Sequence, residues 1–427
     1  MLYQKLEEYY KSFTDFLTLK DYLELLNLLS FEKHHFSKEF IIKKLAIYVN
    51  DYESCFELMT RENYFHIEYS FNCDDEEQIS YFPEKKCEIC NEKIESHEDY
   101  EELFCLSDTI RKIVSDQNKL IFEESFSKQS GLLLDSIKKN LPDLMPFVGS
   151  GVSIPLGFPS WRGIIEKIAE GLSDNKKAII KDHLDRNDYL DCFEIIFSDK
   201  ENQLYKNIQE IKKHFSEEFN KKVDYSIDSN HKDIVNMKYP LIITTNYDLI
   251  LENTKGAIKY ETHVLSQIED ISSLKKERVV LHIHGVSSPS KKDTMVVDKN
   301  DYKKIYENEG IKRKLQSLLG DKVILFIGYS LDDHYFMEEL MKVSQANNNY
   351  ADYYAIMINS DLDILSTKLK YYNKIKIINL NVKVENILVK EDGFSKIVPR
   401  SDSEINNEIV DKIRFLIKYV NNELYFS

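Results

Sequence analysis

One strand–turn–helix junction near the middle of the chain narrows its possible folds more than any other segment. A short apolar run, 146–148, is followed by a glycine- and serine-rich turn, 149–162, and then by a helical pattern that begins at Gly163. Glycine allows close approach of the backbone to a ligand, and backbone N–H groups at the start of a helix can bind a phosphate. Ordinary turn usage in an α/β protein would also explain these glycines, so the turn alone does not fix a function.

The part of the chain after this turn alternates apolar runs with helical stretches. Its runs are rich in Ile, Val and Leu, which is typical of parallel strands buried under helices on both faces. The expected strands are 145–148, 241–244, 279–284, 323–327, 354–358 and 375–380. A long helical insertion, 163–238, separates the first two. The pattern predicts an α/β fold with a Rossmann-like, doubly wound parallel sheet.

A change of pattern near residue 130 divides the chain into two expected domains. Residues 1–130 are predicted to form a mostly helical accessory or regulatory domain, because Leu and Tyr recur there at helical spacing. Within it, 66–105 begins as a strand and continues as a segment similar to a zinc knuckle. Residues 131–427 are predicted to form the α/β domain.

The cysteines raise the question of a metal site. Cys87 and Cys90 form a CxxC pair, which is half of a tetrahedral zinc site. Cys73 with Cys105, or alternatively His97, could complete it, but the sequence has no second CxxC. A knuckle held by packing alone is the favoured alternative, and the thiols are then expected to be reduced.

Charge and hydropathy argue against nucleic acids and membranes as partners. The net charge is −16, from 57 basic and 73 acidic residues, which disfavours a primary nucleic-acid surface. No apolar run approaches the ~18–20 residues that span a bilayer. The first residues lack the apolar stretch of a signal peptide. We therefore expect a cytoplasmic protein that does not bind membranes.

Polar side chains follow two expected strands at their carboxyl ends, where parallel sheets bind ligands. Asn246 offers both a donor and an acceptor, and Asp248 can hold a carboxamide or a ribose hydroxyl. Helix capping is an equally open reading of both residues. His284 ends the next strand beside Gly285, where a neutral imidazole can act as a general base.

Further candidate residues lie near the carboxyl ends of the expected strands. His282 is expected on the same strand face as His284, one pleat earlier, with a structural role. After the run 323–327, Gly328 and Ser330 are expected to meet a ribose or a phosphate. Asp332 and Asp333 follow, and acidic residues there can simply begin the next helix.

Together these elements resemble the sirtuin-like family over roughly residues 131–390. The turn keeps the spacing of the family's GAGxSxxSGIPxFR pattern, with Ser150 in place of alanine, at Gly149, Gly151, Ser153, Gly157, Pro159 and Arg162. The later motifs resemble the family's TQNxD, HG, GTS and INL elements at Thr245–Asp248, His284–Gly285, Gly328–Ser330 and Ile378–Leu380. The order of the motifs is that of the family.

One departure from the family directs the functional prediction. Protein-deacylating sirtuins carry a four-cysteine zinc module after the HG element, whereas no cysteine lies between Gly285 and Gly328 here. The pattern is closer to bacterial sirtuin-like effectors of antiphage defence, which hydrolyse NAD and stop infection by depleting it. The resemblance therefore implies an NAD-binding catalytic domain that cleaves NAD to nicotinamide and ADP-ribose without a metal.

The resemblance also assigns roles to residues. Asn246 would orient the nicotinamide ribose or a water, Asp248 the carboxamide, and His284 would accept a proton from a ribose hydroxyl or water. Trp161 would pack over the nicotinamide ribose, and Arg162 would contact a phosphate. The remaining NAD-binding positions are expected to be Gly149, Ser150, Gly151, Ser153, Pro159, Gly285, Gly328, Ser330 and Asn379.

Two other functions are weaker predictions than NAD hydrolysis. An NAD-dependent protein deacylase is disfavoured by the missing zinc module. A non-enzymatic subunit that senses NAD or ADP-ribose is disfavoured because both Asn246 and His284 are retained.

Since uncontrolled NAD hydrolysis would kill the host, an abortive-infection effector should stay silent until triggered. We expect control by homo-oligomerisation or by a partner, such as a HerA-like ATPase or a phage-derived trigger protein.

Overall fold

A computed structural model gives the fold as two compact units. Unit 1 comprises residues 1–124 and 422–427, and unit 2 comprises residues 125–421. The residues that the structure describes are 3, 5–31, 35–74, 76–80, 86–198, 205–254, 259–275, 278–346, 352–362, 365, 374–384, 387–391, 394–398 and 400–426. Among the described helices, none is both long and apolar enough to span a bilayer.

Unit 1 is mostly helical, as predicted. Its helices are α1 (Glu7–Tyr10), α2 (Leu19–Phe31), α3 (Lys38–Leu45), α4 (Tyr52–Arg61) and α5 (Asp108–Ser125). Side-chain caps start two of them, since Ser37 accepts a hydrogen bond from Phe40 N and Asp51 accepts one from Ser54 N. Four leucines of α2 are buried in the apolar interior of the unit, namely Leu23, Leu25, Leu26 and Leu29.

Unit 1 also contains an antiparallel sheet with the strand order β1-β4-β2-β3. Its strands are β1 (Phe36–Ser37), β2 (Phe65–Cys73), β3 (Glu76–Ser80) and β4 (Glu98–Leu106). The last residues of the chain complete this unit. The Asn118 side chain donates to the Tyr425 carbonyl over 2.8 Å, and Tyr425 N donates to Asn27 Oδ1 over 3.1 Å.

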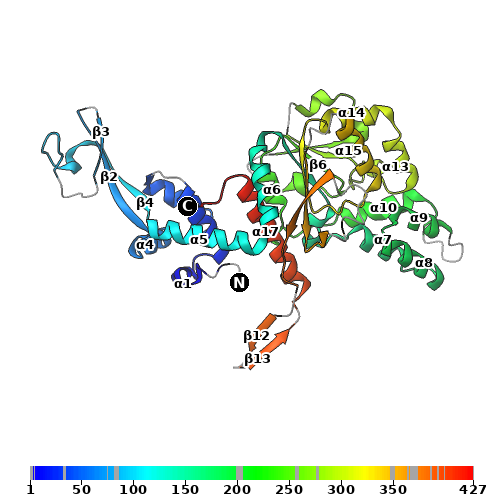
Figure 1. The fold of residues 1–427 in the computed structure, drawn as a ribbon, viewed down its shortest axis with the longest axis horizontal. Coiled ribbons are helices and arrows are strands. Elements are labelled where there is room, and N and C mark those ends of the chain that lie inside the picture. Colours follow the sequence, from blue (N-terminus) through cyan, green and yellow to red (C-terminus); the bar gives the residue numbers. More distant parts are fainter. Residues whose placement is uncertain are drawn as a thin grey trace. The chain divides into compact units, whose positions relative to one another are not determined.

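Unit 2 is built on a seven-stranded parallel sheet with the order β11-β10-β9-β5-β6-β8-β7 (Figure 1). The strands are β5 (Leu144–Val148), β6 (Leu241–Thr244), β7 (Glu261–Val264), β8 (Val279–His282), β9 (Val323–Ile327), β10 (Tyr353–Ile358) and β11 (Ile375–Leu380). The predicted doubly wound sheet is confirmed. Strand β7 was not predicted, because this short strand pairs only with β8 at the edge and is half polar.

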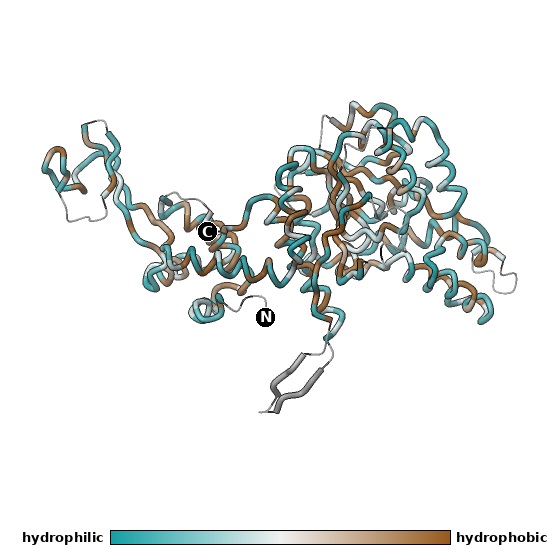
Figure 2. Tube along the Cα trace, viewed as in Figure 1, coloured by the Kyte–Doolittle hydropathy of each residue, from teal (hydrophilic) through white to brown (hydrophobic). Residues whose placement is uncertain are grey.

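The sheet of unit 2 is buried because both of its faces carry apolar side chains. Figure 2 shows the hydrophobic strands inside the unit and more hydrophilic helices outside. On one face, Phe147 and Phe326 lie side by side in register, and the ring of Phe147 contacts that of Phe336. The helices on this face are α13 (Lys299–Tyr306), α14 (Glu309–Leu319) and α15 (His334–Ala346). Helix α6 (Lys128–Lys139) packs along β11, and α17 (Asp402–Val420) packs against α6.

The predicted insertion between β5 and β6 is helical. It contains α7 (Trp161–Ala169), α8 (Asp174–Asp185), α9 (Tyr189–Ser198), α10 (Ile208–Phe219) and α11 (His231–Asn236). Ser160 caps α7 by accepting a hydrogen bond from Gly163 N over 3.1 Å. The apolar sides of α7–α10 form one cluster that also includes Tyr247, Met295 and Val297, so the insertion packs beside the loops that follow β6 and β8. A two-stranded hairpin of β12 (Ile387–Glu391) and β13 (Phe394–Val398), not predicted, precedes α17.

Candidate active site

The topology fixes where a ligand site can form. Strands β5 and β9 are neighbours, but the chain leaves β5 for β6 on one side and leaves β9 for β10 on the other. Such a switch point opens a crevice at the carboxyl ends of the strands. Gly151 N donates to Gly328 O over 2.9 Å, and a Cβ on Gly328 would lie 2.7 Å from Val152 N. The two loops therefore touch backbone to backbone, which requires glycine.

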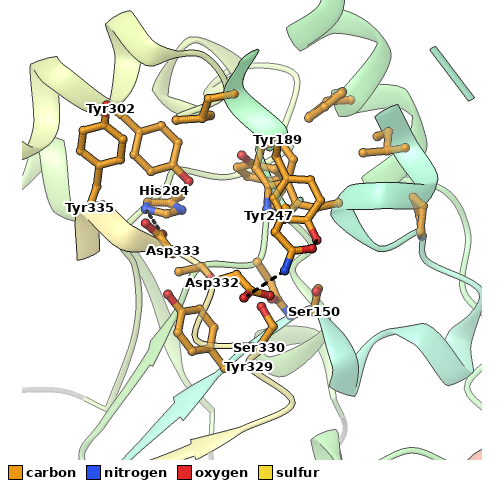
Figure 3. Close-up of a pocket in the computed structure, with 18 of the residues that line it drawn as sticks. Ser150, Tyr189, Tyr247, His284, Tyr302, Tyr329, Ser330, Asp332, Asp333 and Tyr335 are labelled. Atoms are coloured by element: carbon orange, nitrogen blue, oxygen red, sulfur yellow. Dashed lines mark hydrogen bonds and ion pairs between the residues drawn. The ribbon is translucent and has the colours of Figure 1, made fainter. Parts of the chain in front are cut away.

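A cavity of about 270 Å³ lies at this switch point. Its wall contains residues that follow β5, β6, β8 and β9, together with residues of the helical insertion and of α13 and α15 (Figure 3). The sequence-predicted residues in the wall are Ser150, Ser153, Pro159, Trp161, Asn246, Asp248, His284, Gly328 and Ser330. Motifs spread over some 180 positions of sequence thus meet in one cavity.

Asn246 is held rigidly at the carboxyl end of β6. Its side-chain amide donates to Gly149 O and to Ser153 Oγ, each over 3.2 Å, and its backbone N donates to Thr244 Oγ1. The residue is only 7% exposed. Its Oδ1 has no hydrogen-bond partner among the described residues. The amide is therefore fixed so that one acceptor remains available.

Both carboxylate oxygens of Asp248 accept hydrogen bonds. Its Oδ2 accepts from Ser153 Oγ over 2.9 Å, and its Oδ1 accepts from Ile250 N over 3.2 Å. Burial raises the pKa of Asp248, although these hydrogen bonds favour its charged form. Ser153 also contacts Nε2 of the buried His231 over 3.2 Å, and burial lowers the pKa of His231 to about 3. Asp248 thus positions Ser153, which in turn holds Asn246.

His282 supports Asn246 from the other side. Its Nδ1 lies 2.8 Å from the Asn246 carbonyl, and its Nε2 lies 2.7 Å from Glu252 on α12 (Ile250–Asn253). Burial alone would lower the pKa of His282, but the Glu252 carboxylate and the Asn246 carbonyl outweigh it and raise the pKa. The ring therefore donates to Asn246, which fits the structural role that the sequence suggested.

His284 lies in different surroundings from His282. Strand β8 ends at His282, two residues earlier than predicted, and Gly285 turns the chain with a φ of 82°. The His284 ring consequently contacts Tyr302 and Tyr306 of α13 rather than α12. Its Nε2 lies 2.7 Å from Tyr306 Oη and 3.4 Å from Asp333 Oδ2. The expected shared face of the two histidines was therefore wrong.

Burial controls the charge of the His284–Asp333 pair. It lowers the pKa of His284 to about 3, so the imidazole is neutral at physiological pH. It raises the pKa of Asp333 to about 7, although N–H groups of Tyr335 and Phe336 donate to this carboxylate. Asp333 both caps α15 and faces His284, so the capping interpretation of the sequence was incomplete.

Three buried polar atoms of the cavity wall lack a hydrogen-bond partner among the described residues. They are Asn246 Oδ1, His284 Nδ1 and Tyr329 Oη. An unpaired buried polar group costs about 1–3 kcal/mol, so such a group is rare unless it serves a ligand. Their presence in one wall points to a polar ligand that fits among them.

Comparison with known proteins identifies this part of the chain. A family model described as a SIR2-like domain matches residues 240–378, which run from the start of β6 into β11. This segment of the chain is similar to SIR2-like domains. Its sirtuin-like character, inferred from the motifs, is thereby confirmed.

Three curated bacterial proteins are similar to this chain. Defense-associated sirtuin 2 of Bacillus subtilis is 28% identical over 193 residues, which cover 45% of this chain and 18% of that protein. NAD(+) hydrolase ThsA of Bacillus cereus (strain MSX-D12) is 29% identical over 197 residues, 44% of this chain and 37% of that protein. NAD(+) hydrolase ThsA of Cytobacillus dafuensis is 26% identical over 195 residues, 44% of this chain and 35% of that protein. The chain spans less than two-fifths of the length of these relatives.

Some predicted NAD-binding residues lie outside the cavity wall of the SIR2-like domain. Gly149, Gly151 and Gly285 lie where a Cβ would meet neighbouring backbone, so they shape the loops. Arg162 forms ion pairs with Glu166 and Asp185 at the surface. Asn379 exchanges side-chain hydrogen bonds with the backbone of Ser360. Contacts of these residues with NAD stay predictions.

The cavity wall also contains aromatic and acidic residues that the motifs did not reveal. Tyr302 and Tyr335 contact each other in the wall, and Trp161 packs edge-on against Tyr247. The loop between α8 and α9 adds further acidic and aromatic side chains, and the residues that sequence reasoning missed are Asp188, Tyr189, Asp191, Tyr247, Tyr302, Tyr329, Asp333 and Tyr335. Only the helical position of Tyr302 and Tyr306 on α13, four residues apart, offered a signal.

Cys87 and Cys90 belong to unit 1, outside the SIR2-like domain. Their thiols lie near the thiol of Cys73 and the ring of His97. The three sulfur atoms and one ring nitrogen are all within 4.8 Å of one another. Cys105, the other partner considered from sequence, lies instead beside His35 and Glu68. Of the two sets of partners that the sequence left open, the structure therefore combines Cys73 with His97.

Proposed function

We propose that the cavity binds NAD⁺ and that the SIR2-like domain hydrolyses its nicotinamide–ribose bond to nicotinamide and ADP-ribose. The observation that carries this proposal is that three residues lining one cavity each carry a buried polar atom, Asn246 Oδ1, His284 Nδ1 and Tyr329 Oη, with no hydrogen-bond partner among the described residues. Two relatives named NAD(+) hydrolase support the choice of reaction.

The charge of the wall orients the dinucleotide. Asp188, Asp191, Asp332 and Asp333 all line the cavity, and Lys299 is already paired with Asp191 and Glu194. Carboxylates and aromatic faces favour a cation, and the oxidised nicotinamide ring is the cationic part of NAD⁺. We therefore place this ring on the side of Asp333 and Tyr302. The pyrophosphate then lies towards the glycine loop at Ser150 and Gly328, as the motif predicts.

His284 is the proposed general base. We assign its proton to Nε2, because Tyr306 Oη and Asp333 Oδ2 can both accept there, and this leaves the lone pair on Nδ1. The C1′–N bond breaks and nicotinamide leaves with the bonding electrons. A water adds to C1′, and its proton passes to Nδ1, directly or through a ribose hydroxyl. Asn246 Oδ1 accepts a hydrogen bond from that water or hydroxyl and fixes its direction.

Control by oligomerisation or by a partner remains part of the proposal, together with a role as an abortive-infection antiphage effector. Defense-associated sirtuin 2 among the relatives supports a defence role. The cavity of about 270 Å³ is slightly below the ~300–1,000 Å³ typical of ligand pockets, and His284 is only 1% exposed. A trigger that moves the insertion α7–α10 away from the strand ends would open the site.

The proposal is tested by incubating the protein with NAD⁺ and measuring the release of nicotinamide and ADP-ribose by chromatography. His284→Ala and Asn246→Ala should each lower turnover by about 10²–10⁴-fold. His263→Ala on β7 and Asn220→Ala after α10, both outside the cavity wall, are the matched controls and should keep full turnover. The assays are run at several protein concentrations and with neighbouring gene products.

The outcomes separate the three candidate functions. NAD⁺ binding without turnover under any condition would support a sensor and contradict the hydrolase. Turnover that requires an acylated peptide would support a deacylase. Turnover that rises steeply with protein concentration would support control by oligomerisation.

A further inference from the structure

The cysteine–histidine cluster of unit 1 lies at one end of the β2–β4 ribbon, away from helices α1–α5 (Figure 1). Cys73 ends β2, Cys87 and Cys90 lie on one turn, and His97 directly precedes β4. Their Sγ and Nε2 or Nδ1 atoms are all within 4.8 Å of one another. Four separate positions of the sequence thus direct soft ligand atoms to one point.

We propose that Cys73, Cys87, Cys90 and His97 bind one structural Zn²⁺ ion. Zn–S bonds of ~2.3 Å and Zn–N bonds of ~2.0 Å in a tetrahedron place ligand atoms about 3.5–3.8 Å apart. The observed separations, with all atoms within 4.8 Å and Cys90 Sγ 3.0 Å from His97 Nε2, need only small side-chain adjustments to match. Three thiolates and one imidazole fill all four positions, so this zinc would be structural and not catalytic.

The turn that carries Cys87 and Cys90 already has the backbone of a zinc knuckle. The N–H groups of Ile89 and Cys90 donate to Cys87 Sγ, and Asn91 N donates to the Cys87 carbonyl over 2.9 Å. Asn91 has a φ of 62°, which lets the chain reverse directly after Cys90. N–H groups aimed at a sulfur stabilise a thiolate, the form that binds zinc.

His97 is oriented as a ligand by its other ring nitrogen. Its Nδ1 lies 2.9 Å from the Lys93 carbonyl, which fixes a proton on Nδ1 and leaves the Nε2 lone pair facing Cys90. A metal-binding histidine commonly donates its second N–H to a backbone carbonyl in this way. Phe71 packs against the ring and limits its rotation.

The small apolar core at this end of unit 1 gives a reason for a metal. Among the described residues, the buried apolar cluster here consists of Phe71, Cys73, Cys87 and Ile94, with Tyr69 and Tyr100 packed at its edge. A core of this size stabilises a fold only weakly, and very small folded regions commonly rely on a metal or on disulfides. The sequence favoured a knuckle held by packing, whereas the placement of Cys73 and His97 favours a metal.

Metal analysis of the purified full-length chain tests this site. We expect about one zinc per chain in the wild type and in Cys105→Ala, whose thiol lies outside the cluster. The double variant Cys87→Ser, Cys90→Ser should lose the zinc. Zinc retained by the double variant, or zinc lost from Cys105→Ala alone, would overturn the assignment.

Two further measurements keep the proposal testable if the double variant fails to fold. Co²⁺ titrated into the metal-free wild type should give the intense visible bands and the thiolate charge transfer of a tetrahedral site. Only the weak spectrum of six-coordinate Co²⁺, or a disulfide between two of the three cysteines by mass, would contradict it. His97→Ala should weaken zinc binding at least about 100-fold, since even outer partners of a ligand contribute 10–100-fold. His97→Cys should restore binding.

Discussion

The cavity of unit 2 and the cysteine–histidine cluster of unit 1 both gather polar side chains, but the apolar cores that support them differ greatly in size. The cavity lies on seven parallel strands and an apolar cluster that extends through α13, α14 and α15. The cysteine–histidine cluster lies on a core of four buried residues. The first can keep Asn246 and His284 partly unpaired, because its fold is stabilised elsewhere.

The two sites differ in what offsets the cost of burying their polar groups. Unpaired buried groups destabilise a fold, and a large core can offset a few of them. A small core cannot, so its polar groups must find partners within the site. On this view the unpaired groups of the cavity find partners only while a ligand is bound, whereas the groups of the cluster need a ligand that stays bound. Five predictions test the contrast, in order of decreasing expected effect.

Chelation of the metal should affect only unit 1. Structural zinc contributes about 10–16 kcal/mol in small zinc domains, so its removal should unfold the segment from Cys73 to His97. Hydrogen exchange monitored by mass spectrometry should show loss of protection there, with β5–β9 unchanged. Loss of protection throughout unit 2 would mean that the two units are not energetically separate.

Asp333→Asn should have the largest effect within the cavity. We expect turnover to fall by roughly 10²–10⁴-fold, the usual contribution of a general base, because the variant no longer orients His284 with a charge. Wild-type turnover should rise with pH through about 7, the raised pKa of Asp333, and the variant should lack this rise. The imidazole itself, with a pKa of about 3, adds no titration in this range.

The same carboxyl gives a stability test with a defined sign. The folded chain keeps the Asp333 proton up to about pH 7, whereas the unfolded chain loses it near the ordinary value of 3.8. The contribution of Asp333 to the free energy of unfolding therefore falls between these pH values and is constant above them. In urea unfolding, the free energy of unfolding of Asp333→Asn should therefore increase relative to that of the wild type from pH 4 to 7. An unchanged difference would contradict the raised pKa.

Gly328→Ala should destabilise the SIR2-like domain by about 1–3 kcal/mol, because an alanine at a φ of 65° is strained and its Cβ meets Val152. The matched control is Gly163→Ala in α7, where the nearest side-chain atom is 3.5 Å from the new Cβ. Helix propensity predicts that this control stabilises by up to about 1 kcal/mol. Thermal unfolding measures both, and equal effects would mean that the contact of the two loops is unimportant.

Arg162→Ala should have the smallest effect. Its ion pairs with Glu166 and Asp185 are partly exposed, and solvent screens such pairs so that they contribute little to stability. The KM for NAD⁺ decides its role. An unchanged KM is expected if the arginine stays in these pairs, and a KM raised about 10-fold would mean that it turns to a phosphate, as the motif suggests.

The sequence predicted the sheet and most of the cavity because both depend on local patterns. Buried strands read as apolar runs, and Asn246, His284 and Gly328 follow such runs directly. Asp333 and Tyr302 were missed as functional residues because their roles arise only when α13 and α15 pack on the sheet. Strand β7 is too short and polar to stand out.

The course of the backbone between the two units has a consequence for any attempt to separate them. Residues 422–427 return to unit 1, where Tyr425 is bound by Asn27 and Asn118. Unit 2 is thus an insert with two covalent links to its host, one near residue 125 and one near residue 421. A protease cut near residue 421 leaves the two units joined near residue 125, whereas a cut near residue 125 leaves unit 2 covalently attached only to residues 422–427 of its host.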